Sequence, residues 1–214
     1  MNGWVRVDCH LHTVASGDSV LGPDELVERA RAAGIDVVCV TDHHEIVAAQ
    51  RLAAQRGVRV VVGEEIRTPA GELLGLFLAE RIPYVLPVDE VIERIHGQGG
   101  LVCLPHPYDG VRASVGAIAD RLCESGRIDA VEVFNAKTGT PEPNERAAEL
   151  AQRHGLPATA GSDAHDPDGV GAAYLEMPDF RTPQEFLASL RRARVVGTLR
   201  PHAPRYLGRR SPLI

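Results

Sequence analysis

The sequence lacks the features that mark membrane and secreted proteins. No stretch approaches the roughly 18 uncharged apolar residues that a membrane-spanning helix needs, and the N-terminal residues show no signal-peptide pattern. The four cysteines form no CxxC pair and three of them lie inside apolar runs, as expected for reduced, buried side chains. We therefore expect a cytoplasmic protein that has no membrane partner.

Basic residues are scarce relative to acidic ones. The 214 residues include 23 Lys and Arg against 29 Asp and Glu, a formal net charge of −6, and Lys137 is the only lysine. This balance argues against sequence-independent binding to duplex nucleic acid, which needs basic patches. The locally basic segment 205–214 is interpreted as a solvated tail rather than a phosphate-binding arm. We predict one domain over residues 1–214, with residues 203–214 as an extended tail, and the oligomeric state stays open.

The sequence does contain a regular alternation of apolar and amphipathic segments. Helical patterns occupy residues 22–34, 88–100, 143–155 and 182–194. Apolar, β-branched runs typical of buried strands occupy residues 5–9, 37–40, 58–63, 73–78, 101–104, 130–134 and 157–161. This alternation indicates a parallel sheet covered by helices, and about seven short repeats favour a small β/α barrel over an open sheet. The link of only about six residues between positions 65 and 72 predicts a hairpin or a tight bend.

Five of the predicted strands end in histidine or acidic residues, although the strands themselves are apolar. These residues are His10, His12, Asp42, His43, His44, Glu64, Glu65, His106, Asp163 and His165. In a parallel β/α architecture the carboxyl ends of the strands meet at one mouth, where binding sites are built. We therefore expect these side chains to lie close together, with Asp18 on the loop after the first strand.

Each motif alone has an ordinary explanation. The pair His10 and His12 can arise by chance, TDHH can be a capped turn, and SDAH can be the N-cap of a helix. Five such placements at equivalent positions are improbable, however, and so many buried ionisable groups would be costly without a cation. Histidine and carboxylate ligands without thiolates suit zinc, manganese or iron. Because these are more ligands than one ion can use, the pattern predicts two or three divalent ions.

The motifs together resemble the polymerase and histidinol phosphatase (PHP) family of metal-dependent phosphoesterases. The chain reads HLHTVASGD at 10–18, VTDHH at 40–44, GEEI at 63–66, LPHP at 104–107 and SDAH at 162–165. These motifs follow the family's order and extend over essentially the whole chain. The resemblance implies an α/β fold, a distorted seven-stranded (β/α) barrel, with a trinuclear metal centre.

The resemblance also implies how the ligands are shared among the ions. One ion would be held by His10, His12, Glu65 and Asp163, a second by Glu65 and His106, and a third by Asp18, His43 and His165. Many family members have a histidine in a GH pair where this chain has Gly71 and Glu72, and Glu72 is expected as a further ligand of the second ion. The helical insertion of some nucleotide-cleaving members is missing, which predicts a shorter wall around the substrate.

The implied reaction is hydrolysis of a phosphate ester by a metal-bridged hydroxide, which Glu65 and Asp163 would hold through the metals. Arg67, Arg112 and Lys137 follow strand ends and are predicted to grip the phosphate. The expected substrate is a small phosphomonoester or a nucleotide phosphodiester, and nucleic acid is expected only as a short oligonucleotide.

Two other functions stay open. An amidohydrolase-like metal hydrolase also begins with HxH, but its bridging lysine precedes the next lone histidine, whereas Lys137 follows His106. A metal-stabilised domain without activity is the second alternative, because Glu72 replaces a usual ligand. His44 is expected to support the site or to face outward, and His96, His154 and His202 are interpreted as solvated side chains.

Overall fold

The computed structural model describes residues 3–55 and 57–200, and the predicted tail at 203–214 lies outside them. The strands are β1 (Trp4–Leu11), β2 (Val37–Val40), β3 (Arg59–Thr68), β4 (Gly71–Leu76), β5 (Leu101–Leu104), β6 (Ala130–Asn135), β7 (Ala158–Gly161), β8 (Ala173–Pro178) and β9 (Arg194–Gly197). The α-helices are α1 (Pro23–Ala32), α2 (Val47–Ala53), α3 (Val88–Gly97), α4 (Ala119–Glu124), α5 (Glu142–His154) and α6 (Pro183–Leu190).

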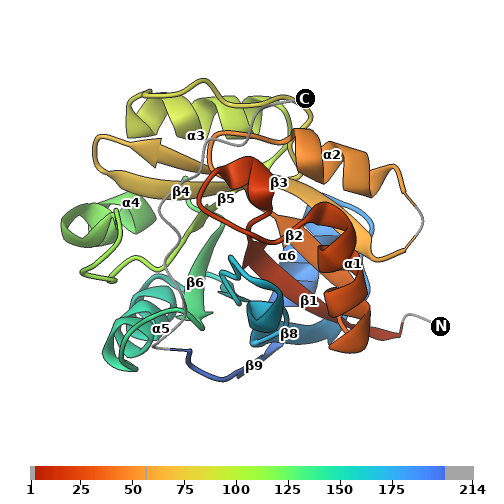
Figure 1. Cartoon of the computed structure of the whole chain (residues 1–214). Helices are drawn as coiled ribbons and strands as arrows, with labels where there is room; N and C mark the ends of the chain where they lie inside the picture. Colours follow the sequence, from red (N-terminus) through yellow and green to blue (C-terminus); the bar gives the residue numbers. More distant parts are fainter. Residues whose placement is uncertain (1–2, 56, 201–214) are drawn as a thin grey trace.

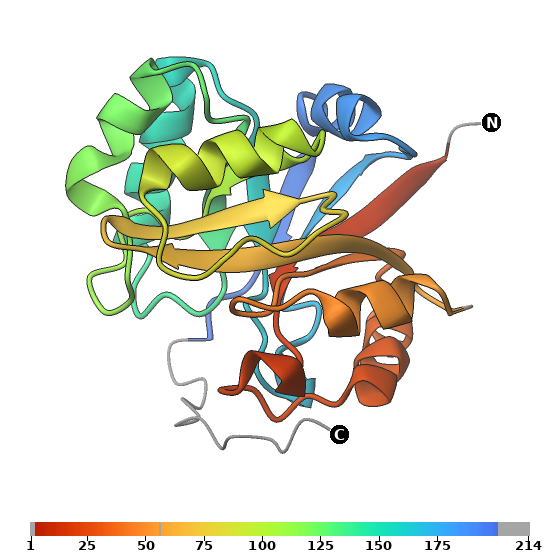
Figure 2. The same cartoon turned by 90° about the horizontal axis from the view of Figure 1, so that it is seen from above.

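The strands form one sheet that curls into a nearly closed barrel (Figure 1). Its order is β7-β6-β5-β4-β3-β2-β1-β8-β9. The pairs β1–β2, β2–β3, β5–β6 and β6–β7 are parallel, so their carboxyl ends lie at one mouth. Figure 2 shows α1 and α2 on one side of the β3–β4 hairpin and α3, α4 and α5 on the other. The predicted α/β barrel class is therefore confirmed.

The four predicted helical segments are present as α1, α3, α5 and α6. Helix α1 shows why the pattern is reliable: Pro23 occupies its first turn, and the turn after the helix passes through Gly34, whose φ is 70°. Its apolar face, including Leu26 and Ala30, is buried against the sheet. None of the helices in the described residues has the length and apolarity to cross a membrane.

The predicted count of seven strands is too low. The described residues contain nine strands, and β8 and β9 were not predicted. Strand β8 alternates buried and half-buried residues and pairs antiparallel with β1, whereas the four residues of β9 are all exposed. Neither strand has the continuous apolar run of a strand buried on both faces.

The predicted hairpin is confirmed between β3 and β4, with Thr68 paired to Gly71. This pairing lengthens β3 as far as Thr68, so Glu64, Glu65 and Arg67 lie within the strand rather than after it. Gly71 has a φ of 132°, and a Cβ there would lie 2.6 Å from the backbone nitrogen of Val115. The turn therefore requires glycine beside the loop that follows β5.

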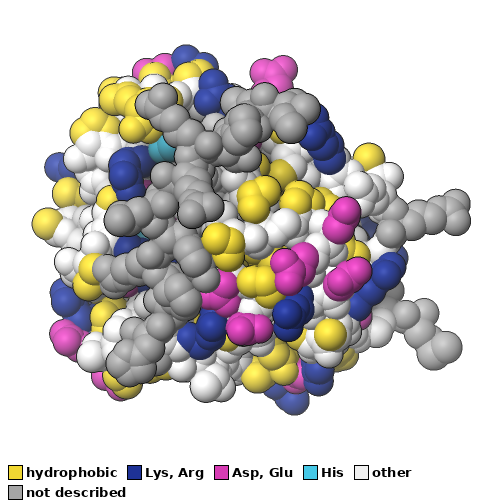
Figure 3. Space-filling model, viewed as in Figure 1, with side chains coloured by type: hydrophobic (Ala, Val, Ile, Leu, Met, Phe, Trp, Pro, Cys, Tyr) yellow, Lys and Arg dark blue, Asp and Glu magenta, His cyan; other side chains and the backbone are white. Residues whose placement is uncertain are grey.

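The surface has no continuous field of one charge on the face seen in Figure 3, where acidic, basic and apolar side chains are interspersed among the described residues. The four cysteines are free and buried, as the sequence predicted. Three of them, Cys9, Cys39 and Cys103, pack together in one apolar cluster of the core with residues of β8 and α6. They therefore act as small apolar side chains.

Candidate metal centre

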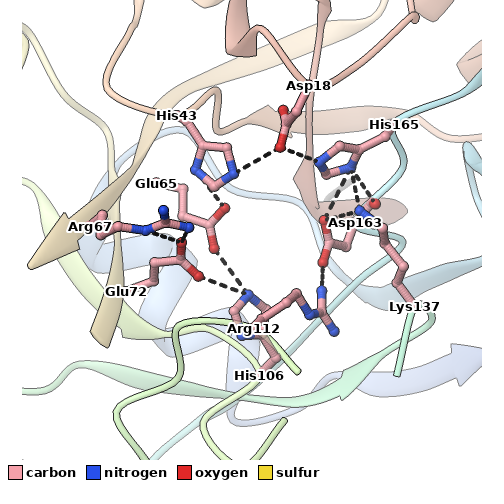
Figure 4. Close-up of a pocket in the computed structure, with 10 residues that line it drawn as sticks. All are labelled: Asp18, His43, Glu65, Arg67, Glu72, His106, Arg112, Lys137, Asp163 and His165. Atoms are coloured by element: carbon pink, nitrogen blue, oxygen red, sulfur yellow. Dashed lines mark hydrogen bonds and ion pairs between the residues drawn. The ribbon is translucent and has the colours of Figure 1, made fainter. Parts of the chain in front are cut away.

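The mouth of the barrel holds a cavity of about 170 Å³ lined almost entirely by charged side chains and histidines (Figure 4). Its walls are formed by Asp18, His43, Glu65, Arg67, Glu72, His106, Arg112, Lys137, Asp163 and His165. His10 and His12 are completely buried and reach the same carboxylates from β1 and the residue after it. The structure thus brings together every predicted ligand and all three predicted phosphate-binding residues.

His10, His12, Glu65 and Asp163 form the first group of candidate ligands. The Nε2 atoms of His10 and His12 lie 3.5 Å and 3.2 Å from Glu65 Oε2, and 3.8 Å and 3.5 Å from Asp163 Oδ1. The two Nε2 atoms are only 3.1 Å apart. Two imidazole nitrogens and two carboxylate oxygens therefore converge on one point.

Glu65 connects this group to a second one. Its Oε1 lies 3.0 Å from His106 Nε2, and its Oε2 lies 3.2 Å from His43 Nδ1. Glu72 Oε2 faces His106 Nε2 at 3.9 Å. Glu72 lies outside the closest cluster of donor atoms, in which His10, Glu65 and His106 come within 4.8 Å of one another.

Asp18 forms the third group with two histidines from different strands. Its Oδ2 lies 3.4 Å from His43 Nε2 and 3.4 Å from His165 Nε2. His12 joins them, because one donor atom from each of the four residues lies within 4.8 Å of the others. The Oδ1 atom of Asp18 is buried and has no hydrogen-bond partner.

The buried carboxylates of this cluster favour positive charge on the groups beside them. Burial opposes ionisation of Glu65, but His10 and His43 beside it hold its pKa well below the usual range. Burial lowers the pKa of His10, yet Glu132 and Glu65 raise it to about 10 overall. Burial lowers the pKa of His106 to about 4, so this ring is neutral at pH 7. Buried carboxylates are thus stabilised by cationic and neutral imidazoles, an environment that fits divalent ions with nitrogen and oxygen ligands.

Two of the candidate ligands, His106 and Asp163, occupy backbone conformations that are rare outside glycine. The φ angles of His106 and Asp163 are 27° and 50°. Backbone hydrogen bonds hold both residues: Asp163 N donates to His10 O at 2.7 Å, and His106 N donates to Glu132 Oε2 at 2.7 Å. Strained backbone conformations of this kind cluster at functional sites, because they direct a side chain into a position that a relaxed backbone would not allow.

The three basic residues contact the ligand carboxylates. Arg67 Nε and Nη2 donate to Glu72 Oε1 at 3.1 Å and 2.8 Å. Arg112 donates to Asp163 Oδ2, and Lys137 Nζ lies 3.7 Å from Asp163 Oδ1. Positive charge therefore borders the cavity on opposite walls.

The other histidines differ from the candidate ligands. His44 is half-buried, has a φ of 54°, and packs edge-on against Tyr84 with ring centroids 4.3 Å apart. It belongs to none of the candidate ligand groups among the described residues. His96 and His154 pair with Asp129 and Asp120 near the surface. His202 lies outside the described residues.

Sequence reasoning missed three residues that support the candidate ligands: Glu132 and Asn135 from β6, and Ser16 from the segment after β1. Glu132 is 1% exposed and contacts His10, and Asn135 contacts Asp163. Ser16 Oγ lies 2.8 Å from His12 Nδ1 and holds that ring in place. The signal available in the sequence was the single glutamate inside the apolar run AVEVF, at a position where a charge needs a buried partner.

Comparisons with known proteins agree with this geometry. The model of the PHP domain matches residues 8–153, and that of a PHP-associated segment matches residues 141–195. The uncharacterised protein MJ1587 of Methanocaldococcus jannaschii is 42% identical to the chain, in a match that covers 62% of this chain and 82% of the relative. The uncharacterised protein MJ0417 of the same organism is 36% identical, in a match that covers 87% of this chain and 79% of the relative. A two-domain protein of Bacteroides vulgatus, described as containing a predicted PHP-like metal-dependent phosphoesterase, superposes with a TM-score of 0.73 and 18% identity over 92% of this chain and 66% of its own.

Proposed function

Because the chain belongs to the PHP-domain family, we propose that it hydrolyses phosphate esters at a centre of two or three divalent metal ions. The observation that carries this proposal is the set of three overlapping groups of candidate ligands at the cavity. His12 belongs to two of these groups, and His10 belongs to two. Three basic side chains border the same cavity. Metal ligands beside cations that can bind a phosphate suit phosphoryl transfer to water.

The ligand distances support a specific division of the ions. His10, His12, Glu65 and Asp163 would hold the first, Glu65, His106 and Glu72 the second, and Asp18, His43 and His165 the third. Manganese, zinc and iron all accept this mixture of imidazole and carboxylate. When bound, such ions act as Lewis acids and lower the pKa of water towards neutrality.

The side chains of the chain itself would position the reactants. Glu65 lies between the first two groups and sets their separation, and Asp163 faces the cavity beside Arg112 and Lys137. Arg112 would bind the non-bridging phosphate oxygens through its planar guanidinium, with Lys137 as a point charge. Arg67 would contact the substrate from the opposite wall.

The size of the cavity supports a small substrate group. A volume of about 170 Å³ accommodates a phosphoryl group but leaves little space for the rest of a substrate, which would remain at the mouth. We therefore favour a small phosphomonoester or a nucleotide phosphodiester, and a nucleic acid only as the end of a short oligonucleotide.

The geometry gives less support to an amidohydrolase-like centre. In that class a modified lysine bridges two ions, but here Glu65 occupies the place between the ligand groups. Lys137 Nζ lies instead beside His165 Nδ1, at 2.9 Å.

The direct test is a screen of phosphomonoesters and phosphodiesters with manganese-loaded protein, with bound metal verified by elemental analysis. We expect turnover of at least one phosphate ester, and we expect Asp163→Ala and His165→Ala to reduce it to the background rate, because each removes a ligand. No turnover of any phosphate ester by the metal-loaded wild-type protein would contradict the proposed activity. A metal content of no more than one ion per chain would contradict the multinuclear centre.

A further inference from the structure

Glu132 lies behind the ligands, in the middle of β6, and is not part of the cavity wall. Its carboxylate is almost completely buried and accepts hydrogen bonds from three directions. His10 Nδ1 lies 3.1 Å from its Oε1, while His106 N and Asn135 Nδ2 donate to its Oε2 at 2.7 Å and 3.0 Å. One side chain therefore holds the ring of one ligand and the backbone of another.

We propose that Glu132 is a positioning residue that fixes the tautomer of His10 and the backbone turn at His106, and so sets the affinity of the two ions that these ligands bind. This inference rests on the proposed metal centre but not on the reaction that it catalyses. Glu132 lies outside all of the sequence motifs from which the ligands were predicted.

The tautomer argument starts from the two nitrogens of His10. A carboxylate has no proton to give, so His10 Nδ1 must carry the proton in this contact. When His10 is neutral, as a metal ligand must be, the lone pair lies on Nε2, which faces Glu65 and Asp163. Metal-binding histidines usually have such a partner on the other nitrogen, and losing it weakens metal binding by about 10- to 100-fold.

The argument from His106 is independent of the tautomer. Its φ of 27° is strained, and the hydrogen bond from its backbone N–H to Glu132 is among the contacts that hold the turn. This turn directs Nε2 at Glu65 Oε1, at 3.0 Å. A weaker bond at the backbone would let the imidazole leave this position.

The orientation of Asn135 shows that a carboxylate is required at residue 132. Asn135 Oδ1 accepts from Lys137 N at 3.0 Å and from Arg112 Nη2 at 3.2 Å, so its amide NH₂ must face Glu132 and Asp163. Three donors thus converge on Glu132. A glutamine of the same shape would place its own NH₂ against one of them, which costs a hydrogen bond and leaves buried donors facing each other.

The test compares metal binding by the wild-type protein and Glu132→Gln, using equilibrium dialysis with Mn²⁺ and with Zn²⁺. We expect two of the bound ions to be held about 10- to 100-fold more weakly, while the ion held by Asp18, His43 and His165 keeps its affinity. Glu176→Gln is the matched control, because it makes the same chemical change in a surface ion pair with Arg6.

A second variant and a spectroscopic measurement separate positioning from folding. Glu132→Asp keeps the charge but is one methylene shorter, so it cannot span His10 and His106 together, and we expect an intermediate loss of affinity for the same two ions. In the zinc-loaded wild-type protein, ¹⁵N NMR should show the proton of His10 on Nδ1. Circular dichroism would establish that both variants are folded.

Three results would overturn the inference: unchanged affinities in folded Glu132→Gln, an equal loss for all ions, or a His10 ring protonated on Nε2 in the zinc-loaded protein. Absence of metal binding by the wild-type protein would be a different failure, because it would remove the proposed centre itself. Unchanged metal binding together with a normal phosphoesterase rate would leave the proposed function intact and reject only the role of Glu132.

Discussion

Glu64 and Glu65 are neighbours in β3 but lie in opposite environments. Successive side chains of a strand point to opposite faces, so Glu65 meets the histidines while Glu64 faces away from them. Glu64 Oε2 accepts from Ile82 N at 2.8 Å, and its Oε1 is buried without a partner. Burial raises the pKa of Glu64 to about 7, whereas the pKa of Glu65 is well below its ordinary range.

The raised pKa of Glu64 predicts a loss of stability with rising pH. Between an unfolded-state pKa of 4.5 and a folded-state value of about 7, the folded protein keeps a proton that the unfolded chain loses, so the free energy of unfolding falls as pH rises through this range. Glu64→Gln cannot ionise and should remove that part of the decline, about 2–3 kcal/mol between pH 4.5 and pH 8.

Urea unfolding of the metal-free protein at several pH values measures this effect. Glu28→Gln, on the exposed side of α1, is the control and should follow the wild-type curve. If Glu64→Gln followed the same curve as wild type, Glu64 would not be the buried acid responsible.

At the scale of elements, the sequence predicts those strands that are buried on both faces of the sheet. The parallel strands β2 and β5 have continuous apolar runs, and β6 has an apolar run interrupted by Glu132. The positions of all three agree with the prediction to within a residue or two. The candidate ligands that follow such strands could be predicted because a polar residue after an apolar run is conspicuous. Strands β8 and β9 lack such runs, and Glu132 was missed because nothing local shows which buried group it contacts.

Closure of the barrel is another feature that depends on contacts between distant segments. Strand β7 is not next to β1 in the order of the sheet, yet a Cβ added at Gly161 would lie 2.4 Å from His10 Cβ and 2.9 Å from Glu132 Oε1. Glycine at this position therefore lets β7 approach β1 directly behind the proposed metal ligands.

We predict that Gly161→Ala destabilises the fold and displaces His10. Overpacking of this kind costs about 1–3 kcal/mol, and the displaced ring should also weaken metal binding. Thermal unfolding and equilibrium dialysis measure the two effects. Gly139→Ala is the matched control, because a Cβ there has open space around it. Equal stability of the two variants would show that β7 can move away from β1 without cost.

At the scale of the whole molecule, the proposed ions would link distant parts of the chain. Their ligands would come from β1, β3 and β4 and from the segments after β1, β2, β5 and β7, so one centre would join residues from His10 to His165. The unfolded chain cannot assemble this set of ligands. Ion binding should therefore stabilise the folded state alone.

Metal removal should accordingly lower the melting temperature. An ion present at 100 times its dissociation constant adds about 2.7 kcal/mol to the stability of the folded state. For a chain of this length each kcal/mol shifts the melting temperature by about 2–4 °C, so chelation of even one ion should lower it by roughly 5–10 °C. Calorimetry of the protein before chelation, after chelation and after readdition of Mn²⁺ measures the change.

Asp18→Asn should lose only the part of the melting-temperature increase that the third ion contributes. The side chain of Asp18 contacts His43 and His165 but neither His10 nor His106. An unchanged melting temperature after verified metal removal would show that the ions do not bind the folded state in preference to the unfolded chain, because any such preference raises the stability of the folded state.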